Sequence, residues 1–89
     1  MSLILIAPDR MHDAARQFAQ AGQQSHDMSV RLQQLTSAIE LDWAGRTHEQ
    51  FYQDYRRWAG QMQQFTNLLN GIGQQLDGIA ARFTAVDNR

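Results

Sequence analysis

The sequence predicts an all-α protein in which two long helices fold back on each other as an antiparallel hairpin, and a second hairpin completes a four-helix bundle. Three observations carry this prediction. Apolar and small residues recur at alternating spacings of four and three through both halves of the 89-residue chain, which is the period of packed helices. One strong break signal, Asp42-Trp43-Ala44-Gly45, separates the halves. The apolar stripes are also wider than a lone hairpin can cover, so a dimer is expected.

The first helix is predicted over residues 8–41, after an extended arm at residues 1–7. Pro8 suits the first helical position, where a missing N–H costs nothing, and Asp9 and Asp13 favour the positive end of the helix. The middle of its stripe is small, which lets another helix approach closely. The stripe consists of Met11, Ala15, Phe18, Gly22, Ser25, Ser29, Leu32, Thr36 and Ile39, with Ala14, Ala21, Met28 and Leu35 beside it.

The turn is predicted at residues 42–45. Asp42 is a suitable N-cap for the helix that follows, and Gly45 accepts backbone angles that other residues avoid. Trp43 is expected to cap the end of the bundle; the alternative is that it stays partly exposed and holds a partner.

The second helix is predicted over residues 46–86, with a short tail at residues 87–89. Asn70-Gly71 resembles a helix C-cap, but the apolar register crosses it intact, which favours one continuous helix. The stripe of this helix consists of Phe51, Tyr55, Trp58, Met62, Phe65, Leu69, Ile72, Leu76, Ile79, Phe83 and Val86.

The large side chains of both stripes are expected to fill the core of the hairpin or of the dimer. In an antiparallel hairpin the aromatic residues of the second helix face the half of the first helix that follows Ser25. The predicted core set is Phe18, Met28, Leu32, Leu35, Ile39, Phe51, Tyr55, Trp58, Met62, Phe65, Leu69, Ile72 and Leu76.

Composition excludes several classes of partner. The chain has no cysteine, so disulfides and thiolate metal sites are absent. A formal net charge of −1 provides no broad field for nucleic acid, and Trp58 beside Arg56 and Arg57 is better explained as part of the stripe. No run approaches the ~20 apolar residues of a membrane span, so stable membrane insertion is not expected. The short run at residues 3–6 lacks the features of a signal peptide, so any export occurs without a cleavable leader.

The sequence contains no recognisable catalytic or metal-binding set. Its three histidines do not have the convergent spacing of metal ligands. Most carboxylates have an arginine three or four residues away, an ordinary surface arrangement on helices. No nucleophile with a base and no phosphate-binding loop is present. We therefore expect neither an enzyme nor a cofactor.

Trp43 and Gly45, two residues apart between two long helices in a chain of this length, resemble the WXG family of small type VII secretion proteins. The likeness extends from the arm and Pro8 through Phe51 and Trp58 to an aromatic residue near the end. It implies a hairpin that dimerises antiparallel, as a homodimer or with a paralogue. It also implies export as a folded dimer by a membrane-embedded secretion ATPase of a Gram-positive or actinobacterial cell, as an effector or as an adaptor for larger substrates.

The export signal of that family is a tyrosine followed four residues later by an acidic residue. Phe83 and Asp87 have the spacing but not the hydroxyl, and the longer tail of many members is missing after Arg89. The pair is either a degenerate export signal, or a core residue and a helix end in a chain that relies on its partner's signal. The predicted function is a non-catalytic type VII secretion substrate or adaptor. The alternative is an intracellular bundle subunit with no export role.

Overall fold

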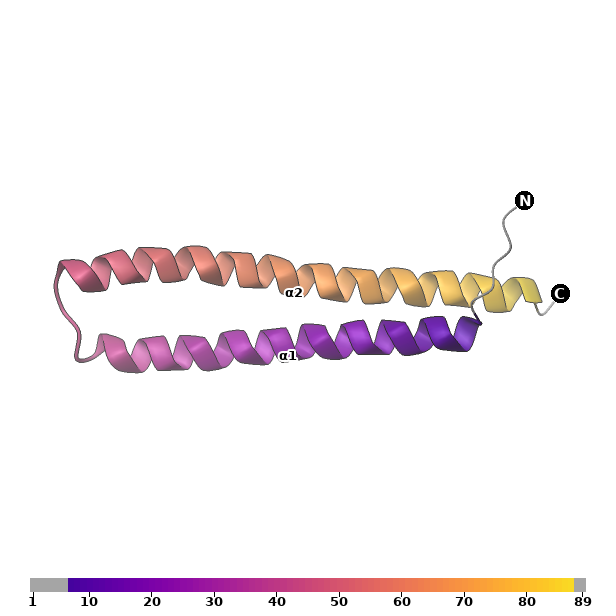
Figure 1. Cartoon of the computed structure of the whole chain (residues 1–89), viewed down its shortest axis with the longest axis horizontal. Coiled ribbons are helices and arrows are strands. Elements are labelled where there is room, and N and C mark those ends of the chain that lie inside the picture. The colour runs from indigo at the N-terminus through magenta and orange to yellow at the C-terminus, as the bar shows by residue number, and fades with distance from the viewer. Residues whose placement is uncertain (1–6, 88–89) are drawn as a thin grey trace.

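The computed structural model describes residues 7–87, with side chains up to residue 83. Helix α1 spans Pro8–Glu40 and helix α2 spans Arg46–Asp87. The two helices lie side by side and antiparallel, with the turn at one end of the rod and the start of α1 and the end of α2 at the other (Figure 1). The rod measures 66 × 22 × 15 Å. This confirms the all-α hairpin. Residues 1–6 of the predicted arm and residues 88–89 of the tail lie outside the described part.

The start of α1 follows from Pro8. Ala7, which precedes it, has an extended backbone and no side-chain cap. Its carbonyl instead accepts the backbone N–H groups of Arg10 and Met11, at 3.0 and 3.3 Å. Proline at the first position leaves one fewer N–H to satisfy, so α1 begins there without a polar cap.

The turn differs from the prediction in one respect: Asp42 is not the N-cap of α2. Its backbone N–H is bonded to the carbonyl of Ile39, at 3.2 Å, and so still belongs to the end of α1. Helix α2 begins at Arg46, directly after Gly45. Gly45 has a φ of +108°, and its carbonyl accepts the N–H of Glu49 at 3.3 Å. The chain reverses at a positive φ just before the helix, and that position favours glycine over aspartate.

The contact between α1 and α2 is made by small side chains, here called the seam. The buried residues of the described chain are Ala15, Gly22 and Thr36 on α1, and Thr66, Gly73 and Ala80 on α2. A Cβ atom added at Gly73 would lie 3.1 Å from the carbonyl oxygen of Ala15. The backbones therefore approach too closely there for a larger residue to fit without movement.

The buried hydroxyls of the seam have partners. Thr36 donates to the carbonyl of Leu32 at 2.8 Å, and the hydroxyls of Thr66 and Ser25 are 2.7 Å apart across the two helices. These bonds remove most of the cost of burying a polar group between helices.

Sequence reasoning did not select the α2 side of the seam. Ala59, Thr66, Gly73 and Ala80 are spaced seven apart, as are the small residues of α1. The small size of both rows, and not the spacing that they share with the large residues, is the signal that identifies the seam. The sequence analysis assigned the large side chains of α2 to the core instead, and these side chains lie beside the seam rather than in it.

Candidate association surface and hairpin tip

The predicted core set lies together along one side of the seam, and we call this surface the apolar face. On an antiparallel pair, residues three places after a seam residue lie on the same side for both helices. Phe18 follows Ala15 in this way, and Leu69 follows Thr66. Both residues line one cavity of about 230 Å³. Residues three places before a seam residue lie on the other, polar side of the hairpin. His12 and Asp77 each precede a seam alanine in this way, and Nδ1 of His12 lies 2.8 Å from Oδ1 of Asp77.

Much of the apolar face is uncovered in the single hairpin. Leu35, Phe65 and Trp58 are 63%, 55% and 51% exposed, and Met28, Leu32 and Ile39 are exposed as well. The remaining members are half-buried; they are Phe18, Phe51, Tyr55, Met62, Leu69, Ile72 and Leu76. A contiguous apolar surface of this length marks an association site. Burial of these side chains against a partner stays a prediction.

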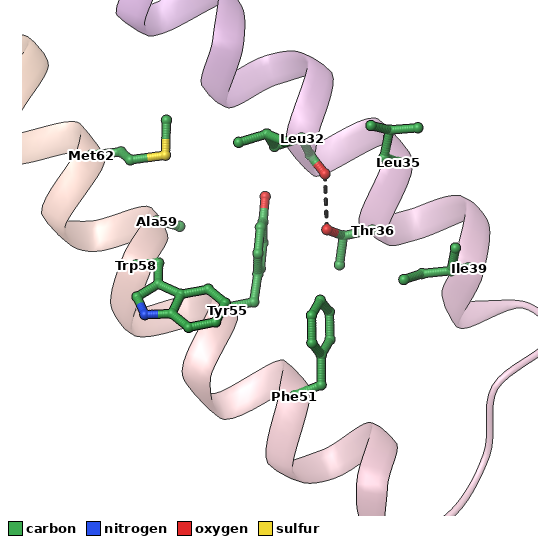
Figure 2. Close-up of a pocket in the computed structure, with 9 residues that line it drawn as sticks. All are labelled: Leu32, Leu35, Thr36, Ile39, Phe51, Tyr55, Trp58, Ala59 and Met62. Carbon is green, nitrogen blue, oxygen red and sulfur yellow. Dashed lines mark hydrogen bonds between the residues drawn. The ribbon is translucent and has the colours of Figure 1, made fainter.

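The half of the face nearest the turn contains a cavity of about 370 Å³. Phe51 and Tyr55 point from α2 into the space between the helices, towards Leu32 and Thr36 (Figure 2). The rings of Phe51 and Tyr55 are stacked, with centroids 6.3 Å apart. The aromatic residues of α2 thus lie beside the second half of α1, where the sequence predicted them.

Trp43 connects the turn to the first turns of α2. Its indole Nε1 donates to the hydroxyl of Thr47 at 3.0 Å, and its ring lies 5.1 Å from Phe51 and 5.7 Å from His48, centroid to centroid. Trp43 is half-buried. These contacts place it over the end of the aromatic row and favour the capping interpretation.

His48, in the first turn of α2, faces the end of α1 at the tip of the hairpin. Its Nε2 lies 3.8 Å from a carboxylate oxygen of Glu40 at the end of α1, too far for a hydrogen bond. With His12 and Asp77 near the other end, a histidine and a carboxylate face each other across the helices at both ends of the rod.

The other features considered from the sequence are a metal site, a membrane span and the pair Phe83 and Asp87. Among the side chains that the structure describes, residues 7–83, no three histidines or carboxylates gather as metal ligands would. Neither described helix combines the length and the apolar content of a membrane span. Phe83 is half-buried near the end of α2. The side chain of Asp87 lies outside the described part, so the Phe83–Asp87 signal stays a prediction.

Comparison with known proteins gives a consistent result. A family model described as proteins of 100 residues with WXG matches residues 3–88. Trp43 and Gly45 supply the tryptophan and the glycine of that description.

Individual relatives and a solved structure agree with the family match. Protein YukE of Bacillus subtilis is 26% identical over 85 residues, which are 96% of this chain and 88% of that protein. The type VII secretion system extracellular protein A of Staphylococcus aureus is 22% identical over 80 residues, or 90% and 82% of the two chains. The crystal structure of a secreted protein ESXB from Bacillus anthracis is similar with a TM-score of 0.87 and 30% identity, covering 98% of this chain and 99% of that one.

Proposed function

This chain belongs to the WXG100 family, since the family model matches residues 3–88, and on that premise we propose that it is a small non-catalytic substrate or adaptor of type VII secretion. It acts as a dimer of helical hairpins. The Staphylococcus aureus relative is named as an extracellular protein of that secretion system, and the Bacillus anthracis neighbour as a secreted protein.

The observation that carries the proposal is the apolar face. A seam of small residues holds the hairpin together, while large side chains such as Leu35, Trp58 and Phe65 stay more than half exposed. Fully burying one such side chain is worth about 1.5–3 kcal/mol, so covering several of them offsets the entropy lost on association. We infer that the large side chains of the apolar face pack against a partner, since the single hairpin does not bury them.

The dimer presents helix ends and a turn rather than a catalytic site. Trp43 and Gly45 shape the tip through the Thr47 bond and the positive φ. We propose that the opposite end, with Phe83 and Asp87 on α2, is read by the membrane-embedded ATPase of the secretion system as a degenerate export signal.

Export is the decisive measurement. The tagged chain, produced in a bacterium that carries a type VII system, is expected in the culture medium without release of a cytoplasmic marker, and deletion of the ATPase should abolish this. Asp87→Asn should reduce export while leaving dimer formation unchanged, because it removes a charge without changing any of the apolar residues expected to pack in the dimer. Phe83→Tyr, which restores the hydroxyl, should raise export.

Each outcome has a clear meaning. Retention of the chain in cells with an active secretion system would contradict the proposal and favour an intracellular bundle subunit. Normal export of Asp87→Asn would remove the role of the Phe83–Asp87 pair alone, and the chain would then depend on a signal carried by its partner.

A further inference from the structure

We propose that Asn70-Gly71 in α2 is a deamidation site that the hairpin keeps closed, so that separation of the two helices is recorded as an irreversible change of Asn70. This inference does not depend on the proposed function. The pair resembles a helix C-cap in sequence, yet it lies inside a helix that continues to Asp87. It is the one asparagine-glycine step in the sequence.

The reaction uses only the chain and water. The backbone nitrogen of Gly71 attacks Cγ of Asn70, a C–N bond forms, and the side-chain nitrogen leaves as ammonia, which takes up the proton of the backbone amide. Water then opens the resulting succinimide ring at either of its carbonyl carbons. The products are aspartate, and isoaspartate, in which the main chain runs through Cβ. Glycine at the second position favours the first step because it has no side chain to hinder its nitrogen.

The helical backbone keeps the two reacting atoms apart. In a continuous α-helix the N–H of Gly71 is bonded to the carbonyl of Asn67, four residues earlier, so its proton is not free to leave. The succinimide ring also closes only when ψ of Asn70 departs from the helical value of about −42°. Both constraints disappear when this part of α2 opens.

Helix α1 adds a further constraint at Gly22. A Cβ added at Gly22 would lie 3.0 Å from Cγ of Asn70 and closer still to its Oδ1. The carbon that must be attacked therefore lies close to the backbone of α1, at a buried position where α1 has no side chain. The position of the Asn70 side chain is thus set by the pairing of the two helices, and not by α2 alone.

This part of α2 depends on α1 for its stability. Three of the six glycines of the chain, Gly71, Gly73 and Gly78, lie here, and each weakens a helix by about 1 kcal/mol relative to alanine. Contact with α1 offsets this loss at the buried residues Gly73 and Ala80. A segment that is held mainly by tertiary contacts opens when those contacts are lost, and the asparagine-glycine step then becomes reactive.

The products do not fit the hairpin. Isoaspartate adds a methylene group to the main chain, so the hydrogen bonds of α2 cannot continue in register past this point. The close approach of Gly73 to Ala15, where an added Cβ would lie 3.1 Å from the carbonyl oxygen, requires a continuous α2. Aspartate keeps the main chain but brings a negative charge beside the buried Gly22. A modified chain is therefore expected to form a weaker hairpin.

The chain offers an internal comparison and a matched variant. Asn67, on the same helix, is followed by Leu68, whose side chain hinders the attacking nitrogen, and its Oδ1 accepts a hydrogen bond from Nε2 of Gln63 at 3.0 Å. Asn67 should therefore stay unchanged while Asn70 converts. A Cβ added at Gly71 would have no neighbour within 4 Å, so Gly71→Ala keeps the hairpin and places a methyl group beside the attacking nitrogen.

The test measures conversion at both asparagines. The natural chain is incubated in mildly alkaline buffer, with and without enough guanidinium chloride to abolish its helical circular dichroism, and peptide mass spectrometry follows the change from amide to acid. Asn70 should convert in guanidinium, and at least about tenfold more slowly without it, because the reactive form is then populated only by local opening. Asn67 should change little in either solution, and Gly71→Ala should slow the conversion of Asn70 in guanidinium.

Refolding measures the consequence. After long incubation in guanidinium and return to buffer, the natural chain should recover less helical circular dichroism than Gly71→Ala treated in the same way. The missing fraction should follow the isoaspartate content.

The contrary outcomes are distinct. Equal conversion of Asn70 with and without guanidinium would show that the hairpin gives no protection and would overturn the proposal. No conversion of Asn70 in guanidinium would overturn the site itself. Full recovery of helicity by chains that contain isoaspartate would overturn its effect on refolding, and none of these results bears on export.

Discussion

At the scale of single residues, Gly45 is the position that the turn depends on most. Its φ of +108° is in the region that L-residues with a Cβ avoid, and a Cβ there would have no neighbour within 4 Å. Any loss of stability in Gly45→Ala therefore comes from the backbone alone, and we expect the free energy of unfolding to fall by about 1–2 kcal/mol. Thermal or urea unfolding measures this.

The matched control for Gly45 is Gly60, within α2, which also has open space at its Cβ position. Because Gly60 has ordinary helical geometry, Gly60→Ala should raise stability by about 1 kcal/mol through helix propensity. A similar gain in both variants would mean that the turn does not hold Gly45 at a positive φ in solution.

At the scale of the helices, the close approach at the seam is the feature to test. Gly73→Ala gains helix propensity but places a Cβ 3.1 Å from the carbonyl oxygen of Ala15 and 3.5 Å from Cβ of Phe18. Since the nearest atom is backbone, the helices must move apart. Gly78→Ala, with nothing within 4 Å, gains the propensity only. We expect Gly78→Ala to be about 1 kcal/mol more stable than the natural chain and Gly73→Ala to show no gain.

Denaturant unfolding of the two variants distinguishes the geometries. Equal gains for Gly73→Ala and Gly78→Ala would show that α1 and α2 are further apart than in the structure. A gain for Gly78→Ala together with no gain, or a loss, for Gly73→Ala locates the tight contact at the seam.

At the scale of the whole molecule, stability should depend on protein concentration. The small seam buries few large side chains, and in the proposed dimer the apolar face is covered only on association, so the melting temperature should rise as the concentration increases. Leu35→Gln should lower the melting temperature because Leu35 is 63% exposed in the hairpin and is covered only in the proposed dimer. Calorimetry over a range of concentrations measures both effects.

Val30 provides the control for that measurement. It is an exposed apolar residue of α1 that lies outside the apolar face. Val30→Gln should leave the melting temperature nearly unchanged at each concentration. Equal effects of Val30→Gln and Leu35→Gln, or a melting temperature independent of concentration, would contradict association through the apolar face.

Much of the molecule follows from the sequence. Pro8 and Gly45 mark where helices begin. The unbroken alternation of four and three through Asn70 and Gly71 favoured a continuous second helix, and α2 extends to Asp87. The prediction that Asp42 caps α2 was wrong because the chain needs a positive φ directly before Arg46. Asp42 instead bonds back to Ile39. Which residue supplies that turn depends on how the two helices are positioned.

By itself the sequence determined two helices, the break between them, and an apolar stripe on each helix that is wider than the contact between the two helices can cover. Only the tertiary structure decided which row of each stripe faces the other helix. Alanine, glycine and threonine rows form the seam, and the leucine, phenylalanine and tryptophan rows lie outside it. The physical reason is that neighbouring rows share the same period of seven, so spacing cannot rank them. Their roles depend on how closely two backbones far apart in the chain approach each other, and the small residues allow the closest approach.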